Sequence, residues 1–168
     1  MHSFSFPPVI AKNAKIIILG TMPGKTSLEQ NEYYAYKYNV FWKIMFKIFN
    51  KNYSDNYNNK LKLLKTNNTA LWDSLQFCYR IGSSDSKIKE EIPNDFNTFF
   101  KNYSTIKDVF FNGTTAMKYY KKYIGFNEFM NYHTLPSTSP ANAAMSFEKK
   151  LKKWSVIIEI LNEKNVKL

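Results

Sequence analysis

Two patterns of hydrophobic positions alternate along the chain. Short apolar runs predict strands at residues 15–19, 69–72, 108–111 and 132–135. Apolar residues repeated every three or four positions predict helices at residues 39–49, 60–66, 95–103, 114–123 and 146–163. A further helix is expected to begin at Asp73, and residues 51–59 and 81–93 are rich in polar or turn-forming residues and are expected to be loops.

Strands that alternate with helices predict an α/β fold, a three-layer α/β/α sandwich whose central, mostly parallel sheet has about four strands. The 168 residues contain no internal repeat or linker, so we expect a single domain over residues 1–168. Open sheets of this kind bind ligands beyond the carboxyl ends of their strands. The loops expected at that edge are residues 20–27, 112–115 and 136–142.

The composition narrows the class of protein. Hydrophobic residues make up 44% of the chain, which excludes a disordered protein, and no run approaches the ~20 apolar residues of a membrane helix. The first residues lack the pattern of a secretory signal, and the single cysteine, Cys78, forms no internal disulfide, so we expect a protein of the reducing cytoplasm. With two histidines and one cysteine, no metal cluster and no cofactor are expected.

The charge suggests a partner. The 24 basic and 13 acidic residues give a formal net charge of +11, enough to attract a polyanion such as nucleic acid. All but one of the basic residues are lysines, however, and a well-solvated lysine-rich surface has the same composition. Charge alone leaves both interpretations open.

The first loop superficially resembles a nucleotide-binding P-loop, since residues 20–26 read Gly-Thr-Met-Pro-Gly-Lys-Thr after a predicted strand. A P-loop needs four residues between its glycines, and here there are three. Pro23 also removes one N–H donor, and no helical pattern follows the Lys-Thr pair. The sequence therefore disfavours an NTPase.

Four segments together resemble another family. They are Gly-Thr-Met-Pro-Gly at 20–24, Asn-Val-Phe-Trp at 39–42, Phe-Asn-Gly at 111–113 and Leu-Pro-Ser-Thr-Ser-Pro-Ala-Asn at 135–142. In order and spacing they resemble the uracil-DNA glycosylase superfamily, and within it the hypoxanthine-DNA (deoxyinosine) glycosylase family, whose members also have the Tyr-Tyr pair seen at 33–34. The resemblance covers residues 15–160.

The resemblance implies a monofunctional enzyme that flips a deaminated base out of DNA, hydrolyses its N-glycosidic bond and leaves an abasic site. It assigns water activation to Asn39, whose amide oxygen would orient the water. The residues expected around the base are Gly20, Thr21, Met22, Pro23, Tyr34, Phe41 and Asn112, with backbone N–H groups of the first loop on the leaving purine, Phe41 as the stacking ring and Asn112 reading the base edge. The residues expected on DNA are Ser137, Thr138, Ser139 and Asn142, in a loop that would enter the space left by the base.

Two positions depart from the superfamily pattern and keep alternatives open. Met22 stands where many members have a catalytic Asp or Asn, and Leu135 stands where a His or Asn is usual. A catalytically silent nucleic-acid-binding module therefore remains an alternative to the expected enzyme, which we take to act as a monomer on DNA containing deaminated bases. A uracil glycosylase of the same superfamily is a further alternative, because base selectivity depends on only a few hydrogen bonds. Asn39 also suits a helix N-cap, and Asn112 before Gly113 also suits a turn.

Overall fold

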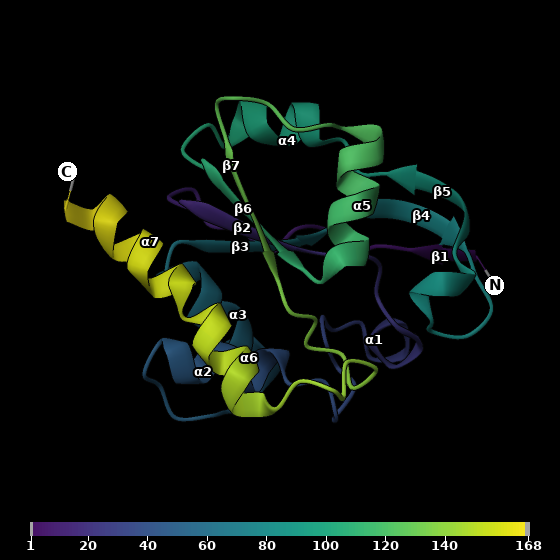
Figure 1. Ribbon diagram of the computed structural model, residues 1–168, viewed down its shortest axis with the longest axis horizontal. Coiled ribbons are helices and arrows are strands. Elements are labelled where there is room, and N and C mark those ends of the chain that lie inside the picture. Colours follow the sequence, from purple (N-terminus) through teal and green to yellow (C-terminus); the bar gives the residue numbers. More distant parts are fainter. Residues whose placement is uncertain (1, 167–168) are drawn as a thin grey trace.

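A four-stranded parallel sheet forms the centre of the computed structural model, which describes residues 2–166 (Figure 1). Its strands lie in the order β3, β2, β6, β7, and each neighbouring pair is parallel. Their bounds are β2 Ile16–Gly20, β3 Thr69–Asp73, β6 Asp108–Asn112 and β7 Asn131–Leu135. The mostly parallel sheet of about four strands predicted from the sequence is confirmed.

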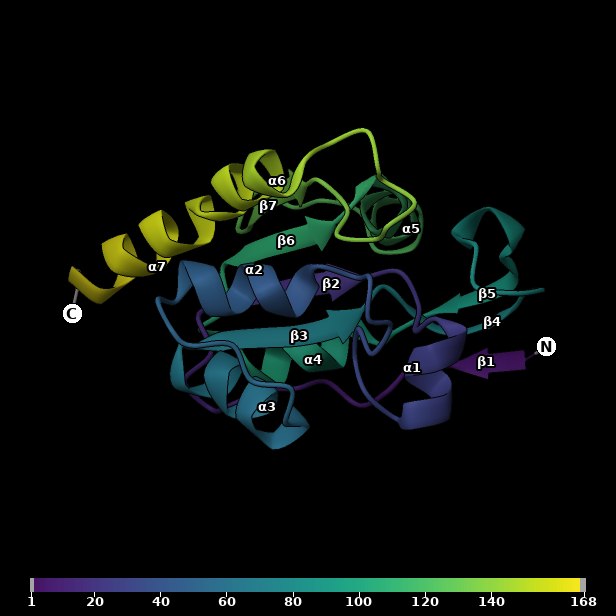
Figure 2. The ribbon, with the colours of Figure 1, turned by 90° about the horizontal axis from the view of Figure 1, so that it is seen from below.

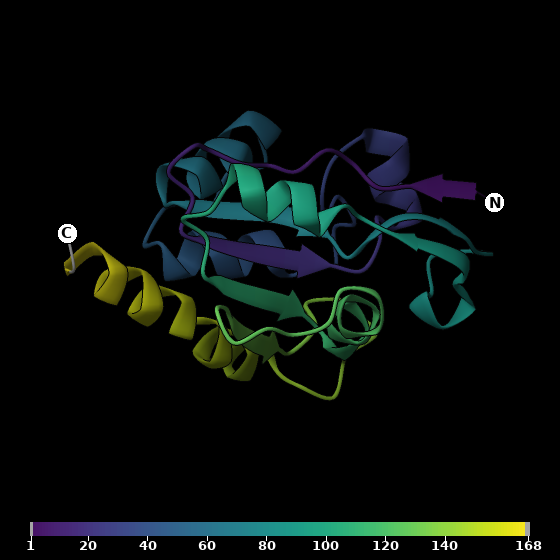
Figure 3. The same cartoon turned by 90° about the horizontal axis from the view of Figure 1, so that it is seen from above.

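Helices cover both faces of this sheet. On one face Ile16 and Ile18 of β2 pack with residues of α2 (Phe41–Ile48), α3 (Tyr57–Thr66), α6 (Phe147–Trp154) and α7 (Val156–Val166), all on the near side in Figure 2. On the other face Ile17 and Leu19 pack with α4 (Phe96–Asn102) and α5 (Thr114–Tyr123), which lie in front in Figure 3. The alternation of side chains along β2 thus produces two separate cores and the predicted three layers.

A second, antiparallel sheet was not predicted. It contains β1 (His2–Phe4), β4 (Leu75–Tyr79) and β5 (Lys89–Pro93), in the order β1, β4, β5. The helix expected from Asp73 is wrong, because only Ser74 separates β3 from β4 and the chain continues as a strand. The expected loop at 81–93 is also wrong in part, since it contains a short 3-10 helix, Asp85–Lys87, and β5.

Several helices differ from the prediction in their number or their boundaries. An unpredicted helix, α1 (Lys25–Gln30), follows the first loop, while α2 begins at Phe41 rather than at residue 39 and α3 begins at Tyr57 rather than at residue 60. The single helix expected at 146–163 is divided into α6 and α7 at Ser155. The Ser155 hydroxyl donates to the carbonyl oxygens of Leu151 (3.1 Å) and Lys152 (2.7 Å), bonds that compete with a regular helix. Within residues 2–166, no helix is both long and apolar enough to cross a bilayer.

Candidate active site

On one face, the carboxyl edge of the parallel sheet carries three polar or small residues, Asp73, Gly20 and Asn112, which we call the polar row. In the strand register Gly20 lies opposite Asp73, and Asn112 lies opposite Leu135. Because side chains alternate along a strand, these residues share the face of Ile18 and Phe110, which is the face covered by α2. The side chains that cover this row come from α2 and from the loop before α2.

The absence of a side chain at Gly20 allows two polar groups to approach the sheet. A Cβ at this position would lie 2.5 Å from Asp73 Oδ1 and 2.8 Å from the hydroxyl oxygen of Tyr34. Any larger residue would collide with both groups. Gly20 is thus required by close packing within the site and not only by a turn.

Asp73 is a site residue that the sequence analysis missed. Its side chain is buried, and its Oδ2 atom accepts a 2.8 Å hydrogen bond from the Ser5 hydroxyl. Burial raises the pKa of Asp73 to about 7, against the opposing effect of the Ser5 hydrogen bond. The available signal was its place at the end of a predicted strand, equivalent to that of Asn112 at the end of another.

Tyr34 and Phe41 form an aromatic stack beside this row. Their ring centroids are 4.1 Å apart with an interplanar angle of 24°. Phe41 is 0% exposed and also contacts Trp42 and Trp154, whereas Tyr34 is partly exposed. The expectation that a base stacks directly on Phe41 is therefore corrected, because Phe41 is fully buried and is stacked against Tyr34, which is the partly exposed residue of the pair.

The conformation of Tyr34 is unusual for a tyrosine. Its φ of 54° lies in the left-handed region, and its buried hydroxyl oxygen has no hydrogen-bond partner of regular geometry among the described residues, although the Asn112 side chain lies near enough to lower the pKa of the phenol. Burial raises the pKa of the Tyr34 phenol, and the nearby Asp73 raises it further, so the hydroxyl stays protonated. A strained backbone and an unpaired hydroxyl in one residue are typical of functional sites.

Asn112 holds the second motif loop rather than projecting freely into the site. Its Nδ2 donates to Thr138 Oγ1 and its Oδ1 accepts from the Thr138 main-chain N–H, both at 2.9 Å. Thr138 is 0% exposed, so the expectation that its hydroxyl binds a DNA phosphate is corrected. One Asn112 amide hydrogen and one oxygen lone pair remain for another partner.

Asn39 lies two residues before the start of α2 and next to the same loop. Its Oδ1 accepts a 3.0 Å hydrogen bond from the Phe41 N–H, and the following residue, Val40, donates its N–H to the Thr138 carbonyl at 3.2 Å. The N-cap of α2 is Val40, which makes no side-chain capping bond, so Asn39 is not the N-cap that the sequence left open but forms a turn with Phe41 before the helix. The bond fixes the half-buried amide and leaves a second Oδ1 lone pair for a water.

The first loop is held by the segment after β4. The Arg80 guanidinium donates to the Pro23 carbonyl and pairs with Asp85 at 3.5 Å. Met22 is buried against Leu75 and Cys78, so its side chain packs into a small core. A contact of its main-chain N–H with a base stays a prediction. Within residues 2–166, the main-chain N–H groups of Thr21 and Met22 donate no hydrogen bond to another main-chain group.

The remaining residues of the second motif stabilise their own loop. Ser137 Oγ accepts from the Ser139 N–H, Ser139 Oγ accepts from the Ala141 N–H, and Asn142 Nδ2 donates to the Ser137 carbonyl, each at 3.2 Å. The buried Trp154 of α6 donates to the Pro136 carbonyl at 2.9 Å and fastens the start of the loop. Both serine hydroxyl hydrogens remain available for DNA phosphates.

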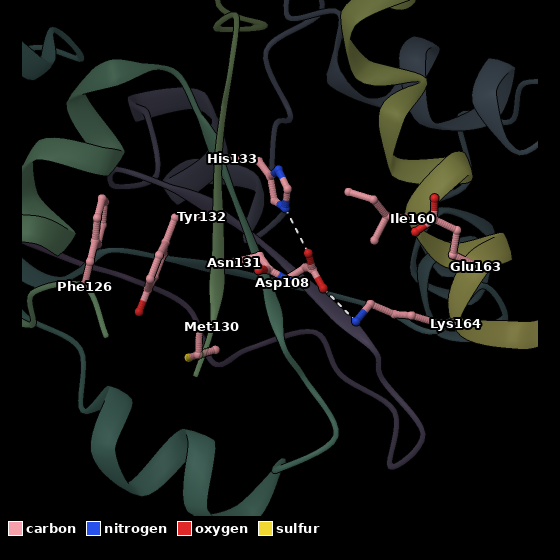
Figure 4. A pocket seen from close by; sticks show the side chains of 9 residues that line it. All are labelled: Asp108, Phe126, Met130, Asn131, Tyr132, His133, Ile160, Glu163 and Lys164. Carbon is pink, nitrogen blue, oxygen red and sulfur yellow. Dashed lines mark hydrogen bonds and ion pairs between the residues drawn. The ribbon is translucent and has the colours of Figure 1, made fainter. Parts of the chain in front are cut away.

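A cavity of about 800 Å³ lies away from these residues (Figure 4). It opens beside Asp108 and Asn131, the first residues of β6 and β7, and hence at the opposite edge of the sheet. Asp108 pairs there with His133 (2.8 Å) and Lys164 (2.6 Å). Burial acts to raise the pKa of Asp108, but the bonds to Lys164 and His133 outweigh it and hold that pKa below its usual value. The cluster joins α7 to the sheet.

The parallel sheet, the two motif loops and the polar row define a member of the uracil-DNA glycosylase class. The chain matches the Uracil DNA glycosylase superfamily over residues 7–162 and belongs to that superfamily. Among the described residues, no group of three or more His, Cys, Asp or Glu side chains is placed to hold a metal ion.

Three relatives make the likeness more specific. A protein of Methanosarcina acetivorans named hypoxanthine DNA glycosylase is 36% identical over 155 residues, which are 90% of this chain and 95% of that protein. One of the same name from Methanosarcina barkeri is 38% identical over 120 residues, 71% of this chain and 76% of that protein. The NMR structure of a Methanosarcina acetivorans protein assigned to the uracil DNA glycosylases superposes with a TM-score of 0.81 at 32% identity, covering 96% of this chain and 99% of that one.

Proposed function

We propose that this protein is a monofunctional DNA glycosylase that releases hypoxanthine from deoxyinosine in DNA and leaves an abasic site. The observation that carries the proposal is the convergence of Asn39, Tyr34 and the Asn112–Thr138 pair at one edge of the sheet, in a chain with two relatives named hypoxanthine DNA glycosylase. The site combines an amide for water, an aromatic face and main-chain donors.

The chemistry requires a held water and stabilisation of the departing base. The extruded base stacks on the partly exposed face of Tyr34, which Phe41 supports from below. Asn39 directs a water at the anomeric carbon through the Oδ1 lone pair that its bond to Phe41 leaves unused. The N–H groups of Thr21 and Met22 donate to the purine, and Ser137, Ser139 and Asn142 face the DNA backbone.

The test is base release from duplex and single-stranded oligonucleotides that each contain one deoxyinosine, deoxyuridine or deoxyxanthosine. Alkali cleaves the strand at any abasic site, so a cleaved product reports release. The proposal expects product with deoxyinosine, and expects Asn39→Ala to reduce its rate constant by about 10²-fold or more while DNA binding persists. No product with any substrate contradicts the proposal and leaves a DNA-binding module.

Uracil is the second candidate base, because the NMR relative is assigned to the uracil DNA glycosylases. The same substrates decide between the two bases. Single-turnover release of uracil at least tenfold faster than that of hypoxanthine identifies a uracil glycosylase, since saturating enzyme removes differences in DNA affinity from the comparison.

A further inference from the structure

The buried carboxyl group of Asp73 has no part in the mechanism above, yet it lies within the site. Asp73 is the last residue of β3, pairs with Gly20 and shares the sheet face of Asn112. Its Oδ2 is bound by Ser5, while its Oδ1 lies against Gly20 close to the Tyr34 hydroxyl. The Asp73 carboxyl group and the Tyr34 ring on which the base is proposed to stack therefore meet at Gly20.

We propose that Asp73 in its neutral form is the proton donor to the leaving base, a role that rests on the proposed function. As the bond between C1′ and N9 breaks, its electron pair passes to the purine, which takes the Asp73 proton at N7 and leaves as neutral hypoxanthine. The water held by Asn39 forms the new C1′–O bond and releases a proton to solvent. Solvent then returns a proton to the Asp73 carboxylate.

The surroundings of Asp73 suit a carboxyl group that is neutral near physiological pH. The residue is 3% exposed, and this burial raises its pKa to about 7. The charged groups near it oppose each other, because Asp85 raises the pKa and Arg80 lowers it. The two phenols that face it, Tyr33 and Tyr34, have raised pKa values themselves and stay neutral.

The proposal predicts a specific dependence of the rate on pH. In single-turnover release from deoxyinosine DNA, the wild-type rate constant is level at low pH and falls about tenfold per unit above pH of about 7. The Asp73→Asn side chain keeps the shape of the aspartic acid but has no acidic proton. This substitution lowers the low-pH plateau of the rate constant by about 10²- to 10⁴-fold and removes its pH dependence. A substrate with 7-deazahypoxanthine, which lacks N7, is bound but released no faster by the wild type than by Asp73→Asn.

Ser5→Ala provides a second variant that leaves the carboxyl group in place. The Ser5 hydroxyl stabilises the carboxylate, so its removal raises the pKa of Asp73 and moves the midpoint of the rate profile to higher pH. Circular dichroism and DNA-binding anisotropy establish that each variant is folded. If Asp73→Asn does not fold, an unshifted midpoint in Ser5→Ala overturns the proposal, and a raised one supports it.

Other outcomes separate this inference from the proposed function. Release by folded Asp73→Asn within threefold of the wild type, or rapid wild-type release of 7-deazahypoxanthine, overturns the role of Asp73 and leaves the glycosylase assignment intact. A wild-type protein that releases no hypoxanthine contradicts both.

Discussion

Asn112 and Thr138 hold each other through two hydrogen bonds that join the end of β6 to the centre of the second motif loop. The amide uses one donor and one acceptor, and Thr138 supplies the complementary pair, both at 2.9 Å. The Thr138 carbonyl then accepts the N–H of Val40, next to Asn39. A single buried contact thus fixes both the loop expected on DNA and the residue expected to hold water.

Asn112→Ala is expected to destabilise the fold and slow base release. The substitution leaves the buried Thr138 N–H unpaired, which costs about 1–3 kcal/mol. Urea unfolding measures the loss of stability, and single-turnover assays measure the rate. Thr138→Ser is the control, since it keeps the hydroxyl and the main-chain bond. Wild-type stability in Asn112→Ala would contradict a structural role for this pair.

Substitutions at Tyr34 separate its ring from its hydroxyl. Tyr34→Ala removes the stacking face and is expected to lower the rate of hypoxanthine release by about 10- to 100-fold, since stacking contributes about 1–3 kcal/mol per base. Tyr34→Phe keeps the ring and removes a buried hydroxyl that has no partner among the described residues, so its free energy of unfolding is expected to equal or exceed that of the wild type. A marked loss of stability in Tyr34→Phe would show that the hydroxyl is paired.

The central sheet could be predicted from sequence because its signals are local. The segments 15–19, 69–72, 108–111 and 132–135 are short, rich in apolar, aromatic or β-branched residues and separated by helical periodicity, and the structure has a strand at each of them. The path from β3 to β4 depends instead on distant partners. The Ser74 hydroxyl donates to the Ala116 carbonyl at 2.9 Å, and Asn94 Nδ2 donates to the carbonyls of Asp73 and Leu75. Nothing in residues 73–75 alone distinguishes the connection between β3 and β4 from the start of a helix.

The candidate site was predictable only in part for the same reason. The motif pattern located Asn39, Tyr34 and Asn112 near one edge of the sheet, but it could not show that Tyr34 lies over Phe41. Nor could it show that Thr138 is buried and hydrogen-bonded to Asn112. Asp73 was missed because a helix was predicted to begin there, whereas its partners Ser5 and Gly20 lie far away in sequence.

Metal removal is expected to leave base release unchanged. The proposed mechanism positions its water with the Asn39 amide and activates the base with a proton, and neither step uses a metal ion. Single-turnover rates measured before and after dialysis against EDTA check this expectation. A rate that falls with EDTA and returns with one divalent cation would require a different source of the nucleophile.

Asp73 is expected to make the stability of the fold depend on pH. Its folded-state pKa of about 7 lies above the ordinary value of 3.8, so the folded state binds more protons than the unfolded chain between these values. Its contribution to stability is therefore fully present below pH of about 3.8 and is lost as pH rises through about 7.

Asp73→Asn removes the charge that burial disfavours. Urea unfolding should show little difference from the wild type at pH 4, whereas at pH 8 the variant should be more stable by about 2–4 kcal/mol. A variant less stable than the wild type at pH 8 would mean that the carboxylate is stabilised in the fold, and such a carboxyl group would hold no proton to donate at neutral pH.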